Sequence, residues 1–350
     1  MSISTQPATS STESSSAWIP PELVSLILAM LWEEPHSPEE RSALLKSIVF
    51  VNRTWLALVA PIASRDVHVS NERNACAFLG LLPKRSLYSD LFIRDVNPFA
   101  NENCRSLTFH VKNRNTSKSP NGDLGSKDLC TPATWWGSQS DAAIAILLST
   151  IYVFHYLPNL RHVLFRYTDW AYDDVFLQLE RMLFPQQATH LSVDYSFTTP
   201  AWALALNESG MVARWSRRRE YPLAPSVRHL SLSGVTTVFV ATMLPVCPNV
   251  ETVEITHPAG LDALAPLLPA VRTLVLRYPG VAVSRKTMMS WNLSAALEDG
   301  LFPERKGKKP RIVVRSGTPE VEPFIELRRS CKGFNVDLVY ERDDARGPSC

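Results

Sequence analysis

The stretch RHVLFRY at residues 161–167 alternates polar and apolar side chains, and similar phrases recur along the chain. They are THLSVDY (189–195), RHLSLSG (228–234), ETVEITH (251–257) and RTLVLRY (272–278). Each begins with a polar pair and continues with alternating apolar residues, which is typical of a half-buried strand. Several follow a similar lead-in, such as LPNL, CPNV or LPAV. The recurrence of one strand pattern indicates an internal repeat.

The spacing of these phrases predicts the architecture. Their first apolar residues lie 28, 39, 23 and 21 positions apart, by subtraction between Val163, Leu191, Leu230, Val253 and Leu274. The last two intervals match the ~20–29 residue period of leucine-rich repeats. Segments that fit helices lie between the phrases, among them GLDALAPLL (260–268) and MMSWNLSAALEDG (288–300), and strand–helix–strand order favours a parallel sheet. We therefore expect an α/β fold over residues 70–342 with a largely parallel sheet, resembling an irregular leucine-rich-repeat solenoid.

The regular leucine-rich-repeat consensus is absent, notably its Asn/Cys ladder position, so a compact α/β domain also fits the pattern. Three further alternating segments extend the expected sheet: RSLTFHV (105–111), RIVVRS (311–316) and NVDLVY (335–340). Residues 112–140 are polar and rich in Gly, Ser and Pro, which predicts a long loop. Residues 343–350 are expected to be a frayed end.

The composition of the chain limits the compartment and the binding partners that we expect for the protein. The chain has 350 residues and a formal net charge of +2, so no overall electrostatic attraction to nucleic acid or membrane is expected. The six cysteines are scattered without a C-x-x-C pair, which favours a reduced cytoplasmic or nuclear protein. Residues 1–16 lack the basic and apolar regions of a secretory signal and are expected to be a disordered tail.

An apolar helix is expected just after this tail. The stretch IPPELVSLILAMLWEE (19–34) has prolines where a first helical turn tolerates them and a wide apolar stripe. A second helix is expected to open near Ser37 or the acidic pair that follows it, and a third over NRTWLALVAPIAS (52–64), where Pro61 bends or ends it. The alternating RDVHVS (65–70) is expected to be a short strand.

Three motifs in this region resemble the F-box domain. They are IPPEL (19–23), ILAML (27–31) and VNRTW (51–55), in the family's order. The resemblance covers residues 17–69 and is closest to the F-box-like modules common in basidiomycete fungi. Ile19 replaces the usual Leu, the loop between the first two helices is long, and Asn52 stands where Cys is frequent. Three ordinary core helices are the alternative interpretation.

The resemblance implies a function without bond chemistry. An F-box docks a Skp1-type adaptor of a cullin-RING (SCF-type) ubiquitin ligase, and the repeat region would hold a protein target. The positions carried over as adaptor contacts are Ile19, Pro20, Leu23, Ile27, Leu28, Leu44 and Val51. A repeat scaffold with no ligase association is the alternative function.

Two clusters are candidates for target binding. Trp135 and Trp136 close the long loop, and adjacent tryptophans suit a binding hot spot, although a ring tucked back onto the domain is the more common outcome. Arg217, Arg218 and Arg219 form the densest basic cluster, which suits an acidic protein segment better than a nucleic acid on a nearly neutral chain. A solvated loop is the plain alternative.

No catalytic, cofactor-binding or metal site is predicted. The sequence lacks a G-x-x-x-x-G-K-[ST] phosphate loop, a G-x-G-x-x-G turn, H-E-x-x-H and G-x-S-x-G. His162, His190 and His229 occupy matching repeat positions, but neighbouring repeats form a row, whereas a metal needs ligands converging on a point. We therefore expect a protein that is not an enzyme and binds no cofactor.

Overall fold

In the computed structural model, the chain forms two compact units, residues 1–62 and 63–350. The structure describes residues 19–34, 37–82, 98–112, 139–170, 176, 179–198, 223–267, 270–280, 283–303, 309–317 and 322–342. Within these residues, no helix is both long and apolar enough to cross a membrane.

The first unit is helical. It contains α1 (Pro21–Glu33), α2 (Pro38–Val51) and most of α3 (Arg53–Arg65). Its core consists of Val24, Leu28, Ile48 and Val59, one or two from each helix. Leu44, Leu45, Trp55, Leu58 and Ile62 pack against this core.

Local signals set the helix ends in this unit. Ser37 caps α2 through a capping box, in which its hydroxyl accepts from the Glu40 amide at 3.2 Å and the Glu40 carboxylate accepts from the Ser37 amide at 2.7 Å. Pro61 lies inside α3, which continues to Arg65, so this proline does not end the helix. The α1–α2 connection is held by Arg41, which donates to the Trp32 and Glu34 carbonyls and lies over the Trp32 ring.

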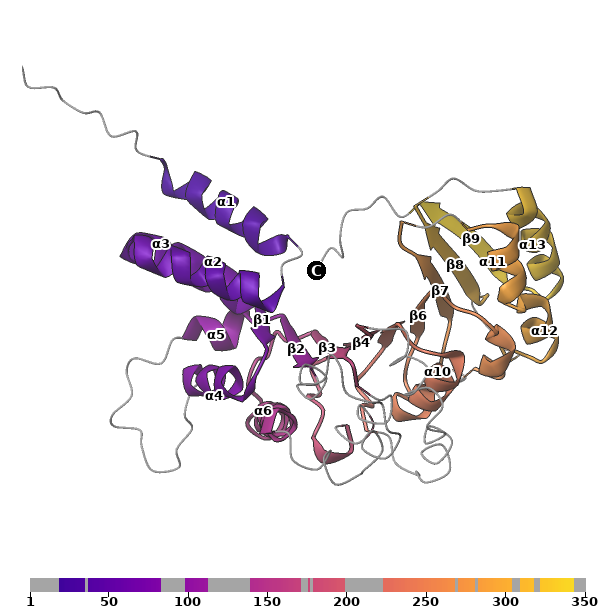
Figure 1. Cartoon of the computed structure of the whole chain (residues 1–350). Helices are drawn as coiled ribbons and strands as arrows, with labels where there is room; N and C mark the ends of the chain where they lie inside the picture. Colours follow the sequence, from indigo (N-terminus) through magenta and orange to yellow (C-terminus); the bar gives the residue numbers. More distant parts are fainter. Residues whose placement is uncertain are drawn as a thin grey trace, which may run out of the picture. The chain divides into compact units, whose positions relative to one another are not determined.

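The second unit is built on one nine-stranded sheet, in which every strand pairs in parallel with its neighbour in sequence (Figure 1). The α/β class and the parallel sheet expected from the sequence are therefore confirmed. The strands are β1 (Asp66–Val69), β2 (Ser106–Lys112), β3 (His162–Thr168), β4 (His190–Ser196), β5 (His229–Ser233), β6 (Thr252–Thr256), β7 (Thr273–Tyr278), β8 (Arg311–Ser316) and β9 (Asp337–Arg342).

The register aligns the repeat positions. Leu107, Val163, Leu191, Leu230 and Val253 are direct cross-strand partners in one row. Nearly all members of this row are fully buried, because they point to the face that the helices cover. Alternation along each strand sends the intervening polar residues to the opposite face, which we call the open face.

The helices of this unit pack on one side of the sheet. Figure 1 shows α4, α6, α10 and α13 on that side. The helical segments are α4 (Glu72–Leu81), α5 (Pro98–Asn103), α6 (Gln139–Phe154), α10 (Thr237–Met243), η3 (Leu244–Val246), η4 (Leu261–Leu264), α11 (Arg285–Ser290), α12 (Leu293–Glu298) and α13 (Glu322–Gly333). Parallel strands need such crossover connections, because a tight hairpin can join only antiparallel strands.

The strand β1 belongs to the sheet. The sequence placed this segment at the end of the N-terminal module, whose expected boundary followed residue 69. In the structure Asp66–Val69 pairs with β2 over four residues, and the boundary between the units falls after residue 62, within α3. A short alternating segment pairs with whichever edge is available, so its sequence alone does not assign it to a unit.

Side-chain amides link the segments that precede neighbouring strands of the sheet. Asn159 donates to the Glu102 carbonyl at 2.7 Å, Gln187 to the Tyr156 carbonyl at 2.7 Å, and Asn249 to the Pro225 carbonyl at 2.9 Å. In each case the donor precedes one strand and the acceptor precedes the strand before it. These three contacts, which we call the amide clips, satisfy loop carbonyls that the sheet ladder does not reach.

Candidate functional site

The helix α1 is apolar on two sides. One side places Val24 and Leu28 in the core of the first unit. The other side carries Leu23 (51% exposed), Ile27 (49%) and Met30 (62%). Residues three and four apart are neighbours on a helix surface, so these side chains form a contiguous apolar group. We call Leu23, Leu26, Ile27 and Met30 the α1 outer face.

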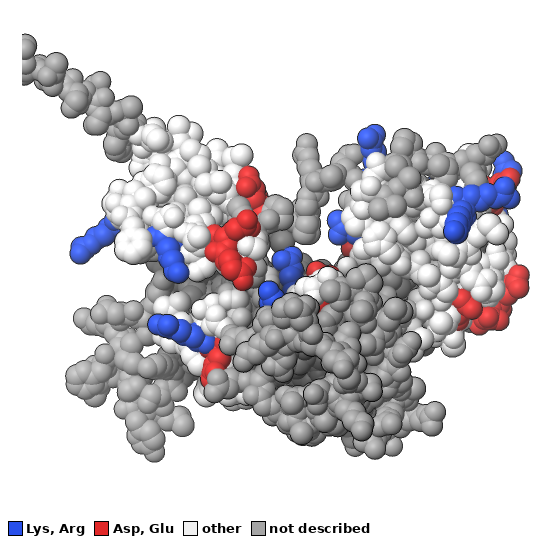
Figure 2. Space-filling model, in the orientation of Figure 1, with Lys and Arg blue, Asp and Glu red and all other residues white. Residues whose placement is uncertain are grey.

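More apolar surface lies at the α2–α3 junction. Phe50 is 86% exposed, and Val51 and Leu56 are exposed as well. Figure 2 shows a largely uncharged surface over α1 on the side in view. Scattered exposed apolar residues are ordinary, but clustered ones mark interaction sites.

The adaptor positions carried over from the resemblance divide by burial. Ile19, Pro20, Leu23, Ile27 and Val51 are exposed. Leu28 is only 2% exposed and belongs to the core, whereas Leu44 is partly buried and packs against that core. Leu26, Met30 and Phe50 are exposed apolar residues that the motif comparison missed. The spacing of Leu26 and Met30 from Leu23 and Ile27 was the available signal.

The candidate target-binding residues belong to the second unit by number, but the structure does not describe them. Trp135, Trp136, Arg217, Arg218 and Arg219 all lie outside the described residues. The polar surface that the structure does describe is the open face of the sheet, where side chains of several strands meet.

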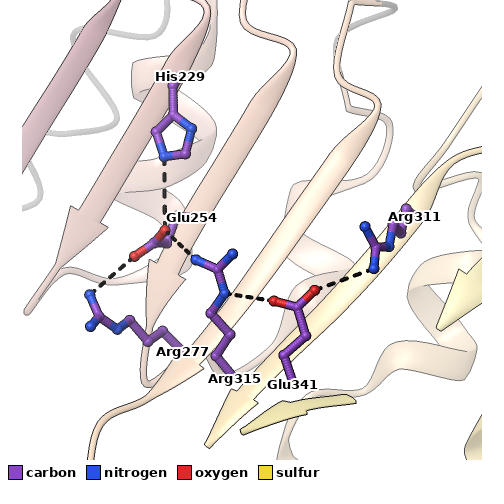
Figure 3. Close-up of polar contacts among 6 residues, drawn as sticks. All are labelled: His229, Glu254, Arg277, Arg311, Arg315 and Glu341. Atoms are coloured by element: carbon purple, nitrogen blue, oxygen red, sulfur yellow. Dashed lines mark hydrogen bonds and ion pairs between the residues drawn. The ribbon is translucent and has the colours of Figure 1, made fainter. Parts of the chain in front are cut away.

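A network of charges crosses the open face from β5 to β9 (Figure 3). The Glu254 carboxylate lies 3.5 Å from Arg277 Nη1, 3.6 Å from Arg315 Nη1 and 3.8 Å from His229 Nε2. Arg315 Nε also lies 3.1 Å from the Glu341 carboxylate, which is 3.3 Å from Arg311 Nη2. These six residues come from five different strands, and the register brings them together.

Burial makes Glu254 the centre of this network. Its side chain is 10% exposed, and a carboxylate so placed requires compensating positive charge. Arg277 and Arg315 supply that charge from the two following strands. Beside them, Val275 and Val313 are buried without belonging to the core cluster. This end of the open face therefore has an apolar floor flanked by paired charges.

Three histidines stack along the start of the strands. The rings of His162 and His190 are 4.3 Å apart, and those of His190 and His229 are 5.1 Å apart. Burial lowers the pKa of all three, and the neighbouring histidines lower it further. At His229 the Glu254 carboxylate opposes this shift in pKa, and Arg315 adds to it. These shifts favour the neutral form of the three imidazoles.

The stacked histidines form no metal cluster in the described residues, and two of the cysteines are buried with raised pKa values. The histidines form a row, and no group of three or more His, Cys, Asp or Glu residues within the described ranges could hold a metal. Burial raises the pKa of Cys247 to about 12 and that of Cys331 to about 11, which makes both thiols poor nucleophiles near neutral pH.

Comparison with known proteins adds no identification. No protein-family model matches the chain, and no curated protein matches it significantly. A function is therefore inferred from two surfaces, the α1 outer face and the open face.

Proposed function

We propose that this protein is a substrate receptor of an SCF-type (cullin-RING) ubiquitin ligase. In this proposal the first unit is an F-box-like module that docks a Skp1-type adaptor, and the second unit holds a protein target. The observation that carries the proposal is the two-sided apolar character of α1, with Val24 and Leu28 in the core and Leu23 and Ile27 exposed.

Hydrophobic burial supplies the docking energy. A half-exposed Leu or Ile gains about 1 kcal/mol when a partner covers its remaining surface, taking about half the value for a whole side chain. The α1 outer face has four such residues, and Phe50 and Val51 add to them. Together they contribute about 6–7 kcal/mol, which offsets part of the entropic cost of association of about 4–15 kcal/mol. Leu28 supports this face from behind and does not touch the adaptor.

The second unit fits the part of an irregular leucine-rich-repeat-like solenoid. Support comes from the sequential order of all nine parallel strands and from the amide clips between consecutive repeats. The open face presents polar and charged side chains at regular spacing. Such a surface binds a target and leaves the chemistry to the ligase.

The protein acts by raising the effective concentration of the target near the ubiquitin-charged enzyme. The adaptor-bound first unit and the target-bound second unit belong to one chain, so the target is held near the ubiquitin-charged enzyme. No step of bond making or breaking is assigned to the receptor. Transfer of ubiquitin then depends on the ligase assembly.

Co-purification with a Skp1-type adaptor tests the proposal. We expect Ile27→Asp to reduce capture at least about tenfold, because a charge on the α1 outer face must be desolvated in the complex. The matched control is Ile146→Asp, another exposed helical isoleucine, in α6 of the second unit. Circular dichroism verifies the fold of both variants.

Two outcomes would contradict this function. A folded wild-type chain that captures no adaptor would leave a repeat scaffold without ligase association as the better description. Equal loss from Ile27→Asp and Ile146→Asp would show that capture does not depend on the α1 outer face.

A further inference from the structure

Arginines recur at the amino-terminal edge of the sheet, in the position directly before a strand. Arg105 precedes β2, Arg161 precedes β3, Arg228 precedes β5 and Arg272 precedes β7. We call these four residues the arginine rim. Arg65 precedes β1 in the same way but lies 4.0 Å from Asp66, while Thr189 and Glu251 hold the position before β4 and β6.

Backbone hydrogen bonds fix the spacing of the rim. The Arg161 amide donates to the Arg105 carbonyl at 2.8 Å, and the Arg228 amide donates to the Thr189 carbonyl at 2.8 Å. The Arg272 amide donates to the Glu251 carbonyl at 2.7 Å. Neighbouring strands are about 4.8 Å apart, so the five steps from β2 to β7 span about 24 Å. The charges of the rim therefore stand on a rigid row.

Neutral groups orient two of the rim side chains. Arg161 Nη1 donates to the Pro158, Leu160 and Gln187 carbonyls at 3.2 to 3.3 Å. Arg228 Nη1 donates to the Asn249 carbonyl at 3.1 Å. A carbonyl positions a guanidinium without cancelling its charge. Both contacts use only Nη1, so the other donors of these arginines can still bind an anion.

Carboxylates do not neutralise the rim. Within the described parts of the chain, none of its four arginines forms an ion pair, although Glu251 stands in the same row. The open face differs, because Arg277, Arg311 and Arg315 are paired there with Glu254 and Glu341. The row therefore carries the four positive charges of the rim against the single carboxylate of Glu251, with no ion pair between them, on a chain whose formal net charge is only +2.

We propose that the arginine rim binds an acidic segment of a protein in extended conformation. Arginine suits carboxylates because its planar guanidinium can donate two parallel hydrogen bonds to one carboxylate. A span of about 24 Å corresponds to about seven extended residues, enough to present several acidic side chains. A nearly neutral chain lacks the broad positive field that drives nucleic-acid binding, which favours a short carboxylate-bearing ligand.

The inference depends on the second unit and needs no adaptor. It rests on the proposed function only in taking the bound segment as part of the ligase target. Binding at the rim and capture of a Skp1-type adaptor are separate measurements, so either can fail while the other stands.

Fluorescence anisotropy with the full-length chain tests the rim. The probe is a labelled peptide of about eight residues in which Glu and Ser alternate, and its comparison peptide has Gln in place of Glu. We expect the Glu peptide to bind more tightly, with an affinity that falls as salt is added. The double variant Arg105→Gln/Arg272→Gln should weaken binding at least about tenfold.

The choice of variants separates binding from folding. No side-chain hydrogen bond ties Arg105 or Arg272 to the described residues, so their replacement should leave the thermal midpoint unchanged, whereas Arg161 and Arg228 support turns. The matched control Arg285→Gln/Arg329→Gln removes the same charge from two exposed arginines on α11 and α13 and should bind the peptide normally.

Three results would overturn the proposal. The first is equal affinity for the Glu and Gln peptides. The second is equal loss in the rim variant and the control variant, which would indicate a diffuse charge effect. The third is tighter rim-dependent binding of a single-stranded oligothymidylate than of the Glu peptide, which would assign the rim to nucleic acid.

Discussion

The two sides of α1 provide a matched pair of substitutions, Leu28→Ala and Leu23→Ala. Both remove the same atoms from the same helix, but Leu28 is 2% exposed and Leu23 is 51% exposed. Leu28→Ala leaves a cavity in the small core with Val24 and Ile48, and should cost about 2–5 kcal/mol. Leu23 buries about half its surface, so its truncation should cost about 1 kcal/mol or less.

Hydrogen exchange read by mass spectrometry isolates this effect within the full-length chain. For Leu28→Ala we expect the opening constant of amides in residues 19–62 to rise by about 30-fold to several thousand-fold. This factor corresponds to the cost of about 2–5 kcal/mol given above. For Leu23→Ala the rise should be about fivefold or less, while adaptor capture falls. Amides of the sheet serve as the internal reference.

One pattern of results would refute the reasoning. If Leu23→Ala accelerated exchange in residues 19–62 as strongly as Leu28→Ala, Leu23 would be a core residue and α1 would have no free apolar side. The proposed docking surface would then be lost with it.

Further substitutions and a pH change probe the second unit. Asn249→Ala removes one amide clip and should lower the free energy of unfolding by about 1 kcal/mol in urea denaturation, with an unchanged m-value. Glu254→Gln should cost about 1–2 kcal/mol, against less than about 1 kcal/mol for the more exposed Glu341→Gln, and equal costs would contradict a central role for Glu254. Lowering the pH below the ordinary histidine pKa of 6.5 should destabilise the unit, because the unfolded chain then binds protons that the stack with its lowered pKa resists. His190→Gln should flatten this dependence, and urea midpoints at several pH values would show whether it does.

The sheet could be predicted because one pattern recurs. The polar pair and alternating apolar residues of RHVLFRY and its copies correspond to β3 through β7, and equivalent letters became direct cross-strand partners. Val163 and Leu191, for example, occupy the same place in their phrases and pair in the sheet. Period-two alternation and chain order were sufficient for this result.

The crossover segments were harder to predict. The segment MMSWNLSAALEDG suggested one helix, but it contains the end of α11 and the whole of α12, separated by Trp291 and Asn292. Asn292 has φ 53°, a left-handed conformation that Asn tolerates better than most residues and that ends a helix. Within the described residues of GLDALAPLL, Leu261–Leu264 form the short 3-10 turn η4. A short apolar segment predicts which residues are buried more reliably than it predicts the type or length of the helix.

The exposed apolar side of α1 could not be derived from its periodicity. The helix is apolar nearly all round, so the pattern marked Leu28 and Leu23 alike, and only packing against α2 and α3 separates core from surface. The amide clips were missed for a related reason. The lead-ins containing Asn159 and Asn249 were visible as recurring letters, but their hydrogen-bond acceptors lie in the preceding repeats and depend on the fold.

The strictly sequential strand order has a consequence for how the second unit folds. Each strand pairs only with the strands before and after it in the chain. Formation of the sheet therefore needs no pairing between strands that are far apart in strand order, and this order resembles a one-dimensional array. Assembly can begin at any adjacent pair and spread in both directions, and unfolding should fray inward from β1 and β9. A destabilising change in a central strand such as β5 would divide the array in two, whereas the same change in β9 would only shorten it.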